Sequence, residues 1–87
     1  MVKVYLPASF RSLTEGTRTA EFDAKTVDEL INRLDERFPG LRQRLCHESG
    51  LKPGIAVAID SRICSHGIHE RLNPGDEVHF LPSVSGG

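Results

Sequence analysis

Apolar and polar residues alternate at the start of the chain. In VKVYL, residues 2–6, the two valines and the leucine share one face, and the lysine and tyrosine share the other. This period of two predicts a half-buried strand that ends at Pro7. SLTEGT at 12–17 reads as a turn, and RTAEFD at 18–23 as a weaker second strand. The short connection predicts an antiparallel hairpin.

The pattern then changes to a helical period. Thr26 and Glu29 have the spacing of a capping box, in which both side chains satisfy free backbone N–H groups at a helix start. Pro39-Gly40 marks the end of this helix. Its charged positions read as a solvated face, and its apolar stripe predicts a helix that covers a sheet. The stripe consists of Val27, Leu30, Ile31, Leu34 and Phe38.

The second half of the chain predicts shorter elements. LRQRLC at 41–46 reads as a helical turn, in which the arginines face solvent, and 47–54 as a loop. IAVAID at 55–60 is an apolar, β-branched run typical of a central strand. A short strand around Ile63-Cys64, one helical turn and a Pro-Gly-Asp turn within 66–76, and a last strand at 77–81 complete the order.

In the last strand, Val78 and Phe80 share one face and His79 and Leu81 the other. We expect the first pair to point inward and Leu81 to be exposed. A hairpin, a long helix and further strands together predict an α+β fold in one domain of 87 residues.

Composition and charge exclude several classes of function. The chain has 11 basic and 12 acidic residues and a net charge of -1, which offers no bulk attraction to nucleic acid or anionic lipid. The sequence has no apolar run of about 20 residues and no signal-peptide layout, so we expect a cytoplasmic protein that does not enter a membrane. Cys46 and Cys64 are expected to be reduced thiols, and their spacing to the histidines fits no common zinc pattern.

The common catalytic motifs are also missing. The sequence contains no nucleophile elbow, zinc-protease motif, phosphate-binding P-loop or dinucleotide fingerprint. A domain of this size has little room for a substrate cleft. We therefore expect a protein that is not itself an enzyme and holds no bound cofactor.

The chemistry is expected at the C-terminal sequence FLPSVSGG, residues 80–87. Pro82 cannot donate to a sheet ladder and helps to end the strand, and the residues from Pro82 onward can extend about 20 Å. Gly86 and Gly87 carry no Cβ, so a terminal carboxylate could enter a narrow site that excludes side chains. Activation by a partner as an acyl-adenylate, followed by attack of a sulfur nucleophile, would convert this carboxylate to a thiocarboxylate.

The whole chain resembles the ubiquitin-like sulfur carriers of the MoaD/ThiS family. The similarity is carried by VKVYLPASFRSLTEG, TVDELINRLDERFPGLRQRL, IAVAID and LNPGDEVHFLPSVSGG. It implies a β-grasp (ubiquitin-like) fold, with a mixed sheet of four to five strands crossed by one main helix. The first and last strands would then lie side by side and parallel. The implied division is a domain at 1–81 and an extended tail at 82–87.

The resemblance also implies roles for individual residues. Gly87 would be adenylated and thiocarboxylated, and Gly86 would give steric access. A docking patch for the activating enzyme is implied at Phe10, Arg11, Ile63, Leu81, Pro82, Val84 and Ser85. For Phe10 and Ile63, plain core packing is the alternative interpretation.

The partners implied are an E1-like adenylating enzyme that uses ATP and a sulfur-accepting enzyme. FPGLRQRL is similar to the branch that serves cysteine or related sulfur metabolism, where the acceptor is a pyridoxal-phosphate synthase. The alternative is the small subunit of molybdopterin synthase, although Leu81-Pro82-Ser83 stands where that subunit often has Phe-Pro-Pro. A ubiquitin-like protein modifier is the other alternative. We expect a monomer when the protein is alone.

Overall fold

The computed structural model describes residues 1–47, 50–52, 55–64 and 66–82. The predicted roles of Val84, Ser85, Gly86 and Gly87 lie outside these residues. The elements are β1 (Val2–Tyr5), the 3-10 helix η1 (Ala8–Phe10), α1 (Arg11–Thr14), β2 (Thr19–Phe22), α2 (Val27–Arg37), α3 (Leu41–Leu45), β3 (Cys46–His47), β4 (Gly50–Leu51), β5 (Ile55–Ile59), β6 (Arg62–Ile63), the 3-10 helix η2 (Gly67–His69) and β7 (Glu77–Pro82).

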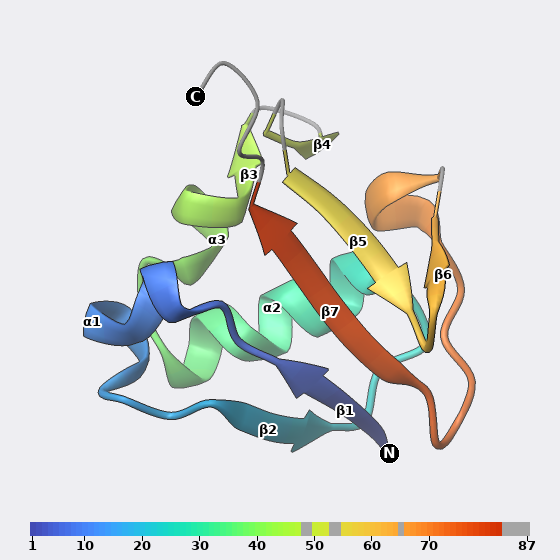
Figure 1. The fold of residues 1–87 in the computed structure, drawn as a ribbon, viewed down its shortest axis with the longest axis horizontal. Coiled ribbons are helices and arrows are strands. Elements are labelled where there is room, and N and C mark those ends of the chain that lie inside the picture. The colour runs from blue at the N-terminus through green and yellow to red at the C-terminus, as the bar shows by residue number, and fades with distance from the viewer. Residues whose placement is uncertain (48–49, 53–54, 65, 83–87) are drawn as a thin grey trace.

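The main sheet has five strands in the order β2-β1-β7-β5-β6. β1 and β7 are parallel, whereas β1–β2, β5–β7 and β5–β6 are antiparallel. α2 lies across one face of this sheet (Figure 1). The mixed five-stranded sheet, its parallel central pair and the crossing helix are those of the expected β-grasp fold.

The core lies between α2 and the sheet. The apolar stripe of α2 is buried, as are the inward-facing residues of β1, β5 and β7, so the faces predicted for α2, β1 and β7 are confirmed. The buried set includes Val2, Val4, Val27, Leu30, Ile31, Leu34, Val57, Ile59, Val78 and Phe80. These side chains meet because the helical period of α2 and the period of two in the strands each place their apolar residues on a single face.

The start of α2 confirms the predicted cap with one difference. The Thr26 hydroxyl oxygen accepts a hydrogen bond from the Glu29 N–H at 3.1 Å. The Glu29 carboxylate accepts from the Lys25 N–H at 2.7 Å, one residue earlier than in a standard capping box. Both interactions supply side-chain partners to backbone N–H groups at the helix entry, which have no carbonyl partner within the helix.

Two segments differ from the pattern-based prediction. The first of these is 12–17, which was predicted as a turn. Its first half belongs to α1, which continues to Thr14, and the turn itself consists of Glu15 and Gly16, with φ of 55° and 84°. The Thr14 hydroxyl donates to the Thr17 carbonyl oxygen at 3.1 Å, which satisfies this buried polar side chain. Within 47–54, expected as a loop, β3 and β4 pair in a two-residue ladder. Elements this short have too few residues to show a period.

Hydrogen bonds connect α3 to a stripe of polar side chains on α2. Arg42 donates to Asp28 Oδ1 at 2.9 Å and to Asn32 Oδ1 at 2.6 Å. Asp35 Oδ1 accepts from the backbone N–H groups of Gly40 and Arg42, each at 3.1 Å. The prediction that the charged positions of this helix form a solvated face is therefore wrong for this stripe, because its side chains bind α3. The apolar residues of α3 are themselves buried in the core, which holds α3 against α2.

β7 extends one residue beyond the predicted strand. Pro82 pairs in register with Ile55 as the last residue of β7, so the sheet continues one residue past the expected boundary at 81. None of the helices in the described part of the chain is long and apolar enough to cross a membrane.

Candidate functional site

The last described element, β7, is the middle strand of the main sheet. β7 is hydrogen-bonded to β1 on one side and to β5 on the other. Phe80 is buried in the core and so anchors β7 just before it ends. β1 is in register with β7 only as far as His79, whereas β5 pairs with it through Pro82, so the end of β7 is held by β5 and by the buried Phe80 side chain.

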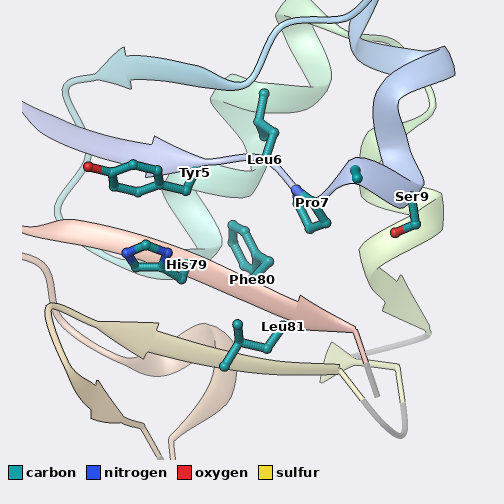
Figure 2. A pocket seen from close by; sticks show the side chains of 8 residues that line it. Tyr5, Leu6, Pro7, Ser9, His79, Phe80 and Leu81 are labelled. Carbon is teal, nitrogen blue, oxygen red and sulfur yellow. The ribbon is translucent and has the colours of Figure 1, made fainter. Parts of the chain in front are cut away.

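A groove lies beside the end of β7 (Figure 2). One side is formed by the end of β1 and the chain that follows it into η1, and the other by the last part of β7. Its volume is about 380 Å³, and its lining is mostly apolar. The lining residues are Tyr5, Leu6, Pro7, Ala8, Ser9, His79, Phe80 and Leu81.

The sheet face opposite α2 carries a row of side chains that continues from the groove. Tyr5 is in register with His79, His79 with Ala58, and Ala58 with Ile63. Residues that pair directly across strands share one face of a sheet, so this row crosses four strands from β1 to β6. Leu81, two residues after His79, projects from the same face.

The expected docking residues fall into different environments. Ile63 is 62% exposed and Leu81 is 40% exposed, and both are among the large hydrophobic residues that remain accessible. Arg11 is exposed at the start of α1. These three residues are accessible to a partner in the way that the docking hypothesis requires.

Phe10 requires a correction. Its side chain is only 5% exposed and belongs to the hydrophobic core, so the alternative of core packing is the one that the structure supports. Within η1, the Phe10 N–H donates to the Pro7 carbonyl oxygen at 3.0 Å. The guanidinium carbon of Arg44 lies 5.4 Å from the centroid of that ring, so Arg44 and not Phe10 faces solvent here.

Several residues of the groove were not singled out from the sequence. Tyr5 and His79 stack with their ring centroids 4.2 Å apart, and Lys3 Nζ lies 5.1 Å from the Tyr5 centroid. The alternation in the first and last strands already placed these residues on the outer face. Only the register of two strands from opposite ends of the chain brings the rings together.

The two thiols do not contribute an obvious nucleophile. Cys46 and Cys64 are both free of disulfides. Burial raises the pKa of each thiol above its ordinary value, which favours the protonated, less nucleophilic form at neutral pH.

Comparison with known proteins settles the family. Residues 4–87 match the ThiS family. The chain belongs to the ThiS family. Over 89 residues it is 30% identical to a putative sulfur carrier protein of Archaeoglobus fulgidus, with 99% of this chain and 98% of the relative covered.

Two further relatives of this ThiS-family chain extend the comparison. It is 33% identical over 67 residues to small archaeal modifier protein 3 of Haloferax volcanii, covering 75% of this chain and 73% of the relative. Among solved structures, the BexX/CysO complex of Amycolatopsis orientalis contains a chain that matches with a TM-score of 0.92 and 31% identity, and the match covers 100% of both chains. The family and the fold expected from the sequence are both confirmed.

Proposed function

We propose that this chain, a sulfur carrier protein of the ThiS type, carries sulfur as a thiocarboxylate on Gly87. The observation that supports this most is the family match, which extends through Gly86 and Gly87. The position of β7 adds to it, because the segment that bears the glycines follows directly from a strand held on both sides. The chain acts as a cosubstrate, and a separate enzyme supplies the catalysis.

The activation has two steps. One oxygen of the Gly87 carboxylate attacks the α-phosphorus of ATP on the partner enzyme, and pyrophosphate leaves. A sulfur nucleophile at the oxidation level of hydrosulfide then attacks the acyl carbon and displaces AMP. The product is the thiocarboxylate, and one proton is released. Gly86 lets the chain enter the adenylating site because no Cβ stands next to the reacting group.

The partners follow from this chemistry. The first is an E1-like adenylating enzyme, and the second is an enzyme that accepts the sulfur. The similarity to a chain of the BexX/CysO complex supports docking on a partner protein. The acceptor that we expect is a pyridoxal-phosphate synthase of sulfur metabolism. Holding the thiocarboxylate on a folded domain raises its effective concentration at the acceptor site.

The proposal is tested by incubating the full chain with the adenylating enzyme of the same organism, ATP and a sulfide source. Intact-mass analysis should show the gain of one oxygen-to-sulfur exchange, located at Gly87 by fragmentation. A chain that lacks Gly87 should gain nothing. The absence of both adenylate and thiocarboxylate on the wild-type chain, under conditions where the enzyme activates its other carriers, would contradict the proposal.

A second candidate is a ubiquitin-like modifier that is attached to lysines. The similarity to small archaeal modifier protein 3 favours it, and it requires the same activated C-terminus. Isopeptide-linked adducts recovered from cells would separate it from a dedicated carrier. Recovery as a stable complex with a larger catalytic subunit would instead point to a molybdopterin synthase subunit.

A further inference from the structure

The hydrogen-bond ladder between β1 and β7 stops at a proline. The Lys3 N–H donates to the carbonyl oxygen of Asp76 at 2.9 Å, and β1 stays in register with β7 as far as His79. The same pattern four residues further along would direct the nitrogen of Pro7 at the carbonyl oxygen of Phe80. Pro7 has no N–H to donate. Within the described residues, the Phe80 carbonyl oxygen therefore receives no ladder donor from the β1 side.

The groove opens where the chain after β1 departs from β7. The Pro7 carbonyl oxygen accepts the Phe10 N–H at 3.0 Å, so the chain enters η1 and does not continue along β7. The side chains of Leu6 and Phe80, both buried, line the groove, and Leu81 at its border is 40% exposed (Figure 2). The groove thus combines an apolar hollow with a backbone acceptor at its β7 side.

The chain itself carries an occupant of matching chemistry next to this groove. Val84 is the one apolar side chain within 83–87, and it follows Leu81 by three positions. Three residues extend by at most about 11 Å, so Val84 stays close to the groove border whatever course the backbone takes. A tethered side chain also enters the groove without the loss of translational and rotational freedom that the association of a separate molecule entails.

We propose that the chain's own segment 83–87 occupies the groove when no partner is bound. The Val84 side chain fills the apolar hollow, and a backbone N–H of the segment donates to the Phe80 carbonyl oxygen in place of the donor that Pro7 lacks. The contact is autoinhibitory, because a partner enzyme has to draw the segment out of the groove before Gly87 can react. This inference concerns the unactivated chain and goes beyond the proposed function, since it does not depend on sulfur chemistry.

The test uses NMR on the full, unmodified chain without ATP or any enzyme. Nuclear Overhauser effects are expected between the methyl protons of Val84 and the side chains of Leu6 and Ala8, which are distant in sequence. Val84→Thr replaces one methyl group by a hydroxyl, so it should lose these effects and shift the amide signals of residues 5–9. The matched control is Ile63→Thr, a similar change at an exposed residue of β6, which should leave those signals unchanged.

The outcomes are distinct. Absence of these effects in the wild-type chain, or unchanged signals of residues 5–9 in Val84→Thr, would overturn the proposal. Contacts that weaken on tenfold dilution would place the segment of a second copy in the groove and would also overturn it. Contacts that are independent of concentration and are lost in Val84→Thr support it. None of these results bears on thiocarboxylate formation, which is measured with the adenylating enzyme, so the two proposals fail separately.

Discussion

The rings of Tyr5 and His79 lie parallel, with their centroids 4.2 Å apart and 3° between their planes. The two residues come from opposite ends of the chain and are brought into register by the parallel pairing of β1 with β7. Both rings line the groove beside the end of β7 (Figure 2). The stack thus connects the pairing of β1 with β7 to the groove that Leu81 also lines.

Replacing one ring should test this connection. His79→Ala is expected to lower the free energy of unfolding by about 0.5–1.5 kcal/mol, because the stacked pair is lost. It should also weaken binding of the adenylating enzyme, because the groove beside Leu81 loses one of its lining rings. His79→Phe keeps an aromatic ring and should retain most of both properties. Chemical denaturation and a binding titration measure the two effects; full affinity for the alanine variant would show that the stack has no part in docking.

Truncating the core should destabilise the protein strongly. Leu34→Ala removes a fully buried side chain of α2 and leaves a cavity, so the free energy of unfolding should fall by about 2–5 kcal/mol. Arg33→Ala, one residue earlier and exposed, should change it by less than about 0.5 kcal/mol. Urea unfolding followed by circular dichroism gives both values. Similar stabilities for these two variants would contradict the assigned orientation of α2.

Asp35 is expected to stabilise the junction between α2 and α3. One carboxylate oxygen accepts two backbone N–H groups at the start of α3, so Asp35→Ala should cost about 1–2 kcal/mol. Asp35→Asn keeps an acceptor oxygen and should cost less. Amide hydrogen exchange at Gly40 and Arg42 should speed up in the alanine variant. If alanine and asparagine behave alike, the hydrogen bonds are not what stabilises the junction.

The thiols should react slowly in the folded protein. Because burial raises the pKa of Cys46 and Cys64, the thiolate fraction at a given pH is smaller in the folded chain than in the unfolded chain. Alkylation by iodoacetamide at pH 8 should therefore be slower in buffer than in guanidinium chloride, and the ratio should shrink as the pH rises. Cys46→Ser and Cys64→Ser report each thiol separately. Equal rates in both solvents would contradict the protection.

The tail should be essential for activation and dispensable for folding. Removing Gly87 should abolish thiocarboxylate formation and leave the thermal melt within about 1 °C, since no core residue is lost. Gly86→Ala should slow activation, because a Cβ would enter the space next to the reacting carboxylate. Gly50→Ala, the same substitution at a glycine of β4 where an added Cβ would meet no atom within 4 Å, is the matched control and should be activated normally. Normal activation of the chain that lacks Gly87 would refute the assigned acceptor position.

The sequence alone determined the element order, the inward faces and the family resemblance, because each of these depends on residues close together in the chain. The periods of VKVYL and of the helix that starts after Thr26 identify their buried faces without knowledge of any neighbour. The short elements η1, α1, β3 and β4 were not predicted, because each has only two to four residues and none shows a clear period.

Tertiary structure decided which side chains remain accessible and which meet. From the sequence, Phe10 and Ile63 could each belong either to a docking patch or to the core. The Phe10 ring is buried beneath Arg44, whereas the Ile63 side chain is exposed on β6. The contacts of Tyr5 with His79, and of Arg42 with Asp28, join positions far apart in the chain. Local pattern carries no information about such pairs, because the burial of a side chain depends on which distant segments fold against it.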